Sequence, residues 1–468
     1  MTDTSIPSMQ DSEKPTHNAR SFYLTAWRWH FYAALYVIPF LMILAISGLT
    51  MLWISVLSGR DGEWIEVQPQ AQVLPVSELG VAALAAVPEG ELRSYIAPRA
   101  DDLVALFRVD QGSEAKMVAV NPYTAEIVNQ MSRRGGLYDL ANDIHGTLLL
   151  GTTGDRLIEI AASLTMVLIA TGLYLWWPRD RSVTSVLLPD LRARGRALWR
   201  TLHITTGVWI SLVLVVFLVS GLSWSGIWGE KLVQAWSTFP AEKFDAPLSE
   251  DVHASMNHGT RKDVPWVLEQ TRMPLSDVGV DGAARPDRPV SLDEAVGIAA
   301  SLGFENRYQL SFPSGADGVW TISRDSMSND SSDPTSDRTV HVDQYSGAPL
   351  ADVRFEDYSV YGQAMAVGIA FHEGDLGIWN IALNTLVCLS VIFLSVSGVV
   401  LWWKRRPAKA LRLAAPPQPK ATALWQGALL IGFAISMMFP LAGLTLLTVL
   451  AADYLVLSRI PALRRVLS

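Results

Sequence analysis

The residues best suited to chemistry in this 468-residue chain are four histidines that occupy matching places in its two halves. They are His30, His145, His203 and His372. Neutral imidazoles are common metal ligands, and two that face each other across a helix bundle suit the axial positions of a haem iron. They suit zinc poorly, because a closed zinc site takes four protein ligands. Two such pairs therefore predict haem sites.

Other kinds of site have little support in the sequence. The single cysteine, Cys388, excludes an intramolecular disulfide and any zinc or iron–sulfur site built from cysteines. The sequence has no phosphate-cradling glycine loop, nucleophile elbow, HExxH motif or basic nucleic-acid stripe. We therefore expect no catalytic residue beyond a haem iron and no nucleic-acid partner.

The elements that must position the histidines are apolar. Half of the residues are hydrophobic and 18% are charged, against roughly a quarter charged in soluble domains. Five uncharged stretches, each long enough for a helix to cross a lipid bilayer, cover 29–59, 160–178, 201–229, 376–403 and 421–452. This composition excludes a disordered or fibrous protein and predicts a membrane protein.

The last stretch is too long for one ordinary span. Pro440 lies near its middle, and proline interrupts helices, so we predict a hairpin of two short helices. A single kinked helix is the alternative.

The distribution of Lys and Arg predicts the orientation. These residues cluster between the second and third stretches and again after the fourth, so both connections should face the cytoplasm. Both terminal tails are also basic, which requires an even number of spans and favours the hairpin. The long segments 58–155 and 230–375 then lie outside the cytoplasm.

Both outer segments have the pattern of small α+β domains. In each, a helix that begins after a proline, Pro75 or Pro289, precedes a strand–turn–strand segment. We expect the Ser-, Asp- and Asn-rich residues 326–338 to form a solvated loop. Three further histidines, His253, His258 and His341, are expected at the surface of the second domain.

The spans repeat in the same order. Ser47-Gly48 follows His30 by 17 residues, and Ser220-Gly221 follows His203 by the same 17. The chain is thus two tandem copies of span, outer domain and span. A pseudo-twofold arrangement would bring His30 opposite His203 near the cytoplasmic face and His145 opposite His372 on the outer face. Glycines after the outer histidines would let each imidazole fold back over the bundle.

Other residues near the histidines suit a haem. Arg28 and Arg200 are placed to pair with its propionates at the cytoplasmic face. A flat macrocycle needs closely spaced helices, and small residues occur at the required places: Gly48, Gly172, Gly207, Gly221 and Gly398. The alternative is that the histidines anchor span ends, the glycines pack helices, and the arginines follow the charge rule for cytoplasmic loops.

The predicted fold is an α-helical polytopic membrane protein with a four-helix core bundle, a C-terminal hairpin and two small outer α+β domains. The division is a tail 1–23, a span 24–57, an outer domain 58–144, a histidine segment and span 145–178, a loop 179–200, a span 201–229, an outer domain 230–371, a histidine segment and span 372–403, a loop 404–420, a hairpin 421–456 and a tail 457–468.

Several of these motifs together resemble a known family. The segments HGTLLLGTTGDRL and TGLYLWWPR within 145–179, HEGDLGIWN and SVSGVVLWWKRRP within 372–407, and the hairpins VNPYTAEIV and VDQYSGAPL are similar to the PepSY-associated transmembrane family of iron-regulated, PiuB-like proteins. The resemblance covers roughly residues 20–456.

The resemblance implies a bacterial inner-membrane protein with periplasmic PepSY domains, in a group that includes di-haem ferrisiderophore reductases. It implies two b-type haems with His30, His145, His203 and His372 as axial ligands. The expected activity is reduction of a ferric siderophore or other Fe(III) chelate for iron acquisition, with electrons from a cytoplasmic or quinol donor. The alternatives are a membrane-anchored PepSY module that controls a periplasmic partner or protease, and an iron or siderophore transporter.

Overall fold

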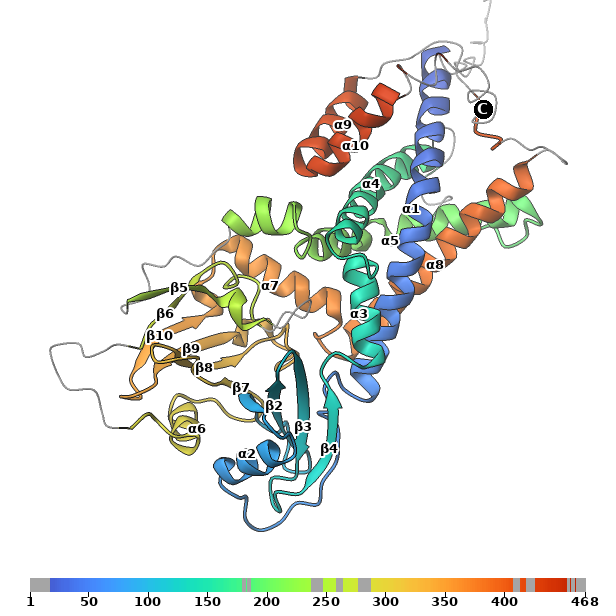
Figure 1. Ribbon diagram of the computed structural model, residues 1–468. Coiled ribbons are helices and arrows are strands. Elements are labelled where there is room, and N and C mark those ends of the chain that lie inside the picture. The colour runs from blue at the N-terminus through green and yellow to red at the C-terminus, as the bar shows by residue number, and fades with distance from the viewer. Residues whose placement is uncertain are drawn as a thin grey trace, which may run out of the picture. The chain divides into compact units, whose positions relative to one another are not determined.

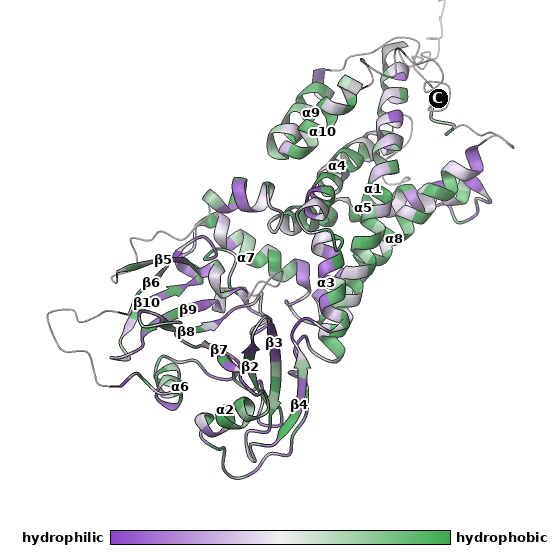
Figure 2. Ribbon diagram, viewed as in Figure 1, coloured by the Kyte–Doolittle hydropathy of each residue, from purple (hydrophilic) through white to green (hydrophobic). Residues whose placement is uncertain are grey.

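The computed structural model describes residues 17–178, 182, 187–236, 247–257, 264–276, 288–406, 413–417, 426–452, 455 and 459. Four of its helices are long and apolar enough to cross a membrane. They are α1 (His17–Leu57), α4 (Thr152–Trp176), α5 (Arg196–Leu222) and α8 (Ile378–Arg405). Apolar residues run along all four helices (Figure 2). The chain is therefore a membrane protein.

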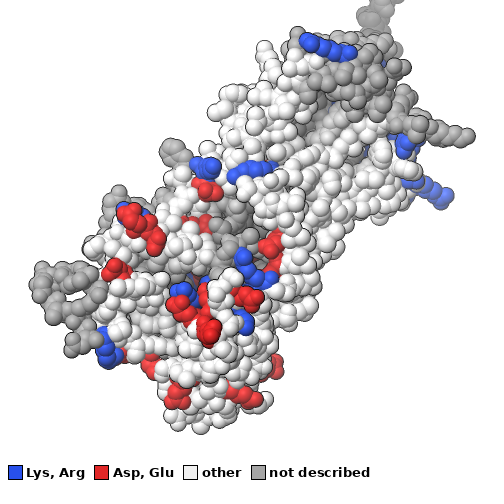
Figure 3. Space-filling model, in the orientation of Figure 1, with Lys and Arg blue, Asp and Glu red and all other residues white. Residues whose placement is uncertain are grey.

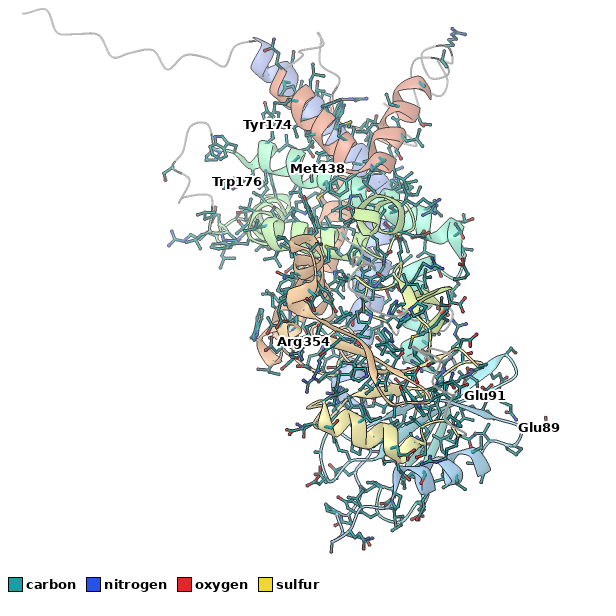
Figure 4. All side chains as sticks on the ribbon, turned by 90° about the vertical axis from the view of Figure 1, so that its left-hand side faces the viewer. Glu89, Glu91, Tyr174, Trp176, Arg354 and Met438 are labelled. Carbon is teal, nitrogen blue, oxygen red and sulfur yellow. The ribbon has the colours of Figure 1, made fainter. Side chains whose placement is uncertain are left out.

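Helix α4 begins before the uncharged stretch at 160–178 that the sequence shows. Its first turns carry Asp155 and Glu159, and the Glu159 carboxylate is buried because it accepts hydrogen bonds from the backbone N–H groups of Ile227 and Trp228, at 3.2 and 3.0 Å. Hydrogen bonds of this kind offset part of the cost of burying a carboxylate. Tyr174 lies near the other end of the helix (Figure 4). Its ring packs edge to face with that of Phe22, with the ring centres 4.9 Å apart.

The C-terminal apolar residues form two short helices, α9 (Gln426–Met438) and α10 (Pro440–Ala452). The break falls at the predicted proline, and the buried Phe439 lies between the helices. Each has 13 residues, fewer than the about 20 that span a hydrocarbon core.

By its contacts the chain divides into two compact units. The first, the helical unit, comprises Met1–Leu41, Ile160–Leu212 and Phe393–Ser468. The second, the sheet unit, comprises Met42–Glu159 and Val213–Ile392. The acidic and basic side chains visible on the sheet unit gather over its strands and loops (Figure 3).

One antiparallel eight-stranded sheet forms the centre of the sheet unit, in the order β10-β9-β8-β7-β1-β2-β3-β4 (Figure 1). Its strands are β1 (Glu91–Ile96), β2 (Ala105–Gln111), β3 (Glu114–Val120), β4 (Ile127–Ser132), β7 (Gln309–Ser311), β8 (Val319–Arg324), β9 (Arg338–Asp343) and β10 (Pro349–Arg354). A separate two-stranded sheet pairs β5 (Leu248–Val252) with β6 (Arg272–Pro274). Short helical turns occur at Trp228–Val233, Gln234–Trp236, His253–Met256, Pro334–Ser336 and Phe355–Asp357.

The two segments that the sequence treats as separate domains share this sheet. Strand β1 from the first segment pairs with β7 from the second, with Tyr95 opposite Leu310. Helices α2 (Val76–Ala85) and α6 (Leu292–Ser301) pack on one face over a common apolar core that includes Phe107. Because this core continues across the β1–β7 junction, the segments bury apolar surface together that each would otherwise expose.

Two expectations about polar residues are wrong, one of them in part. Residues 326–338 form a loop in which Ser332, Asp333 and Thr335 are exposed, as expected, but Ser326, Asp330 and Asp337 are at most 7% exposed. Asp330 forms a 2.8 Å ion pair with the buried Arg307. His253 and His341 are also buried instead of lying at the surface, and their Nε2 atoms are 2.8 Å apart. These polar side chains can be buried because they have hydrogen-bond partners within the fold, and the polarity of a residue does not reveal such partners. His258 lies outside the described residues.

Candidate functional site

The sheet unit brings His145 and His372 together. Helix α3 (Leu137–Thr147) carries His145 and α7 (Val360–Glu373) carries His372, and both precede the long apolar helices. The ring centres are 6.3 Å apart and the ring planes are inclined by 75°. The sequence predicts this pairing from the repeat alone.

Helix breaks place these two histidines as expected, although one break uses other residues. Gly374 ends α7 with φ +94°, directly after the turn that holds His372. In the first copy Gly146 stays within α3, and the chain turns at Leu148, Leu149 and Gly151, with φ +53°, +60° and +55°. Left-handed backbone is unfavourable for leucine, and backbone hydrogen bonds from Leu148 to Ile144 and from Leu149 to Asp143, at 3.1 and 3.4 Å, close this turn.

All four histidines have a Ser or Thr hydroxyl at Nδ1, and Nδ1 of His372 also lies 3.0 Å from the carbonyl oxygen of Phe217. Each Nδ1 contacts a Ser or Thr hydroxyl on another helix: His30 with Thr171 at 3.0 Å, His145 with Ser47 at 3.0 Å, His203 with Ser397 at 2.7 Å and His372 with Ser220 at 3.2 Å. Both partners of each contact belong to the same unit.

The partners of Nδ1 favour a proton on that ring nitrogen. The clearest case is His372, whose Nδ1 lies 3.0 Å from the Phe217 carbonyl oxygen, which can only accept. The hydroxyls of Ser47, Thr171, Ser220 and Ser397 each also contact a carbonyl of their own helix, and a hydroxyl that donates there accepts from Nδ1–H. In this arrangement Nε2 is unprotonated, and it is the atom that binds a metal when Nδ1–H is held by a second partner.

The residue after each hydroxyl is a glycine that makes room for the ring. A Cβ atom on Gly221 would lie 2.9 Å from Cε1 of His372, and one on Gly48 would lie 3.2 Å from Cε1 of His145. The corresponding distances are 3.3 Å for Gly172 with His30 and 3.7 Å for Gly398 with His203. The same three-residue unit thus occurs four times. It consists of a Ser or Thr hydroxyl, the glycine that follows it, and a histidine whose imidazole packs against both.

Burial keeps the outer imidazoles neutral. It lowers the pKa of His145 to about 4. It lowers the pKa of His372 to about 3, and the neighbouring His145 adds to the effect. Both rings are therefore uncharged at neutral pH, which is the form that binds a metal.

The helical unit contains the second pair. His30 on α1 and His203 on α5 are close enough to interact electrostatically. Arg28 donates to the carbonyl of Pro416 and, at 3.0 Å, to the Tyr32 hydroxyl, so its guanidinium already has partners in the protein. Arg200 is exposed.

Sequence reasoning missed two asparagines of α8 that hold the His372 segment. The Asn384 side-chain amide donates to the backbone carbonyls of Phe371 and His372, at 3.0 and 2.9 Å. Asn380 donates to Phe371 as well and contacts Asn384. Both asparagines are buried in a helix otherwise rich in apolar residues. Two amide side chains in an apolar run of the sequence are the pattern that could have identified them.

Among the described residues, no three His, Cys, Asp or Glu side chains gather into a group that could hold a metal ion. Each histidine pair could therefore offer a metal at most two imidazole ligands. Two ligands are too few for a closed zinc site but match the number of axial positions of a haem iron.

Comparison with known proteins agrees with this arrangement of helices and sheet. No curated protein matches the sequence. A family model described as PepSY-associated TM region matches residues 27–405, which include all four histidines and the whole sheet unit. The chain therefore belongs to the PepSY-associated transmembrane family.

Proposed function

We propose that this chain binds two b-type haems, one at each histidine pair, and carries electrons across the bacterial inner membrane. The acceptor would be a ferric siderophore or another Fe(III) chelate on the periplasmic side, and the donor a cytoplasmic reductant or a quinol. The observation that carries the proposal is the fourfold unit in which a hydroxyl contacts Nδ1 of a histidine and favours an unprotonated Nε2.

The distance between the imidazoles of His145 and His372 suits a haem iron held between them. Metal–imidazole bonds are about 2 Å long. Two imidazoles bound through Nε2 on opposite sides of one metal would therefore have ring centres roughly 6 Å apart. The observed separation of 6.3 Å between the centres of His145 and His372 supports axial ligation of this kind.

The chain's own residues would hold and shield the group. Haem supplies one-electron transfer when bound. Ser47, Ser220 and the Phe217 carbonyl orient the outer imidazoles, and Gly48 and Gly221 let the rings approach the helices. An outer-sphere electron transfer needs no general acid or base, in keeping with the lack of a catalytic motif in the sequence.

The transport alternative predicts an ionisable residue in the spans, and the contacts of the best-buried candidate, Glu159, argue against it. Glu159 is a buried carboxylate near the start of α4, and intramembrane acids often mark ion paths. Its oxygens accept from the backbone of Ile227 and Trp228, so they already serve the structure.

Reduction of external ferric chelate by proteoliposomes tests the proposal. His372→Ala should abolish reduction with a donor on either side. His203→Ala should abolish it with an internal donor but leave part of it with a soluble reductant outside, because the outer pair remains. Equal loss with both donors would contradict a path that uses two sites in sequence.

A further inference from the structure

Arg60 connects four parts of the sheet unit through one guanidinium. It follows α1, and its side chain is 10% exposed. Nε donates to the Ser55 hydroxyl at 3.2 Å, and Nη1 donates to the carbonyl of Met327 at 3.0 Å. Nη2 forms ion pairs with Glu373 at 2.9 Å and Asp375 at 3.0 Å. The guanidinium also lies 5.8 Å from the centre of the Tyr138 ring.

Two of these contacts lead directly to the outer histidine pair. Glu373 is the residue after His372, at the end of α7. Tyr138 belongs to α3 and precedes His145 by seven residues, about two helical turns. The helices α3 and α7 come from different halves of the sequence. Because the Arg60 side chain contacts a residue at one end of each helix, it constrains the positions of His145 and His372 relative to each other.

The charges next to His372 have opposite signs. The Arg60 guanidinium is always protonated, and the carboxylates of the partly exposed Glu373 and the buried Asp375 lie against it. Charges in a poorly solvated region act over longer distances than charges in water. A nearby positive charge favours the reduced state of a redox group, and a nearby negative charge favours the oxidised state.

We propose that Arg60 is a positioning residue for the outer histidine pair, which it clamps through α3 and α7, and that its charge raises the reduction potential of the group bound there. This inference rests on the proposed function. The inference gives a role to Arg60, a residue that contacts neither imidazole and does not belong to the fourfold histidine unit.

The test is a potentiometric titration of the purified, haem-loaded full chain, in which the two haems give separate midpoints. Arg60→Gln removes a positive charge and should lower one midpoint. Glu373→Gln removes a negative charge and should raise the same midpoint. Arg60→Lys keeps the positive charge, so its midpoint should lie nearer that of the wild type than the midpoint of Arg60→Gln does. Arg338→Gln, which breaks a 2.8 Å ion pair with Asp352 in the sheet, should leave both midpoints unchanged.

Opposite shifts of a single midpoint support the assignment, because a merely structural defect would not change sign with the charge removed. Shifts in the same direction, equal shifts of both midpoints, or no shift overturn it. If Arg60→Gln fails to fold, Arg60→Lys and Glu373→Gln decide together: a near-wild-type midpoint in Arg60→Lys with a raised midpoint in Glu373→Gln supports the assignment, and any other pair of results overturns it. A wild type without haem overturns the proposed function together with this assignment, whereas haem with unshifted midpoints overturns only the role of Arg60.

Discussion

The hydroxyl oxygen of Ser47 on α1 lies 3.0 Å from Nδ1 of His145 on α3. The same hydroxyl lies 2.8 Å from the Ile43 carbonyl, and when it donates there it accepts from the imidazole, which leaves Nε2 of His145 unprotonated. One hydrogen bond between two helices thus orients the proposed ligand and favours the tautomer that can bind a metal.

Ser47→Ala should weaken haem binding at the outer site. The variant loses the partner of Nδ1–H, and loss of such outer partners typically costs 10- to 100-fold in affinity. The measurement is a titration of the haem-free protein with haemin. Thr50→Ala is the matched control, because Thr50 lies on the same helix and donates only to the Ile46 carbonyl. Equal affinities of Ser47→Ala and wild type would contradict the orienting role.

Alanine at the four histidine-facing glycines should reduce haem content in a set order. The expected loss is greatest for Gly221→Ala, whose Cβ would lie 2.9 Å from His372, and smallest for Gly398→Ala, at 3.7 Å from His203. Haem content of the purified variants provides the measurement. Gly207→Ala is the control on α5, since its Cβ would meet only Leu394, at 3.8 Å. A variant series without this order would show that the glycines only pack helices.

The buried pair of His253 and His341 should make the sheet unit sensitive to acid. Burial lowers the pKa of His253 to about 4, and burial together with His253 lowers the pKa of His341 well below its usual range. An unfolded histidine titrates near 6.5, so the unfolded state binds more protons between pH 6.5 and about 4. The contribution of the pair to stability is complete above pH 6.5 and falls as the pH decreases towards 4.

Thermal unfolding at pH 7 and pH 5 checks this expectation. His253→Gln cannot titrate there, so its unfolding temperature should fall less between the two pH values than that of the wild type. An equal fall in both proteins would place the acid sensitivity in other groups.

The basic residues predict the orientation of the chain. Reporters fused after Arg194 or Arg406 should be cytoplasmic, and reporters within 62–130 or 240–360 should be periplasmic. Paired alkaline phosphatase and fluorescent protein fusions distinguish the two locations. A periplasmic signal after Arg194 would reverse the proposed direction of electron transfer.

Much of the fold follows from local patterns in the sequence. Long apolar runs predict the four spanning helices, Pro440 predicts the break before α10, and the tandem repeat predicts that His145 meets His372. These features depend on helix periodicity and on residues that interrupt helices, and both are visible in a single sequence.

Long-range pairing is less visible. The β1–β7 junction joins strands more than two hundred residues apart, and nothing in either strand specifies its partner. The burial of His341 and Asp330 depends on partners brought together only by folding, so their polarity suggested exposure. The roles of Thr171 and Ser397 were also missed, although each precedes a glycine in the pattern already seen at Ser47 and Ser220.

A reduced-minus-oxidised visible spectrum with haem quantitation tests the central claim most directly. The wild type should contain two bis-histidine b-type haems per chain. His30→Ala should lose only the haem of the helical unit, and His145→Ala should lose only the haem of the sheet unit, because each ligand pair lies within one unit. A wild type without haem would contradict the account, and so would two intact six-coordinate haems in His145→Ala.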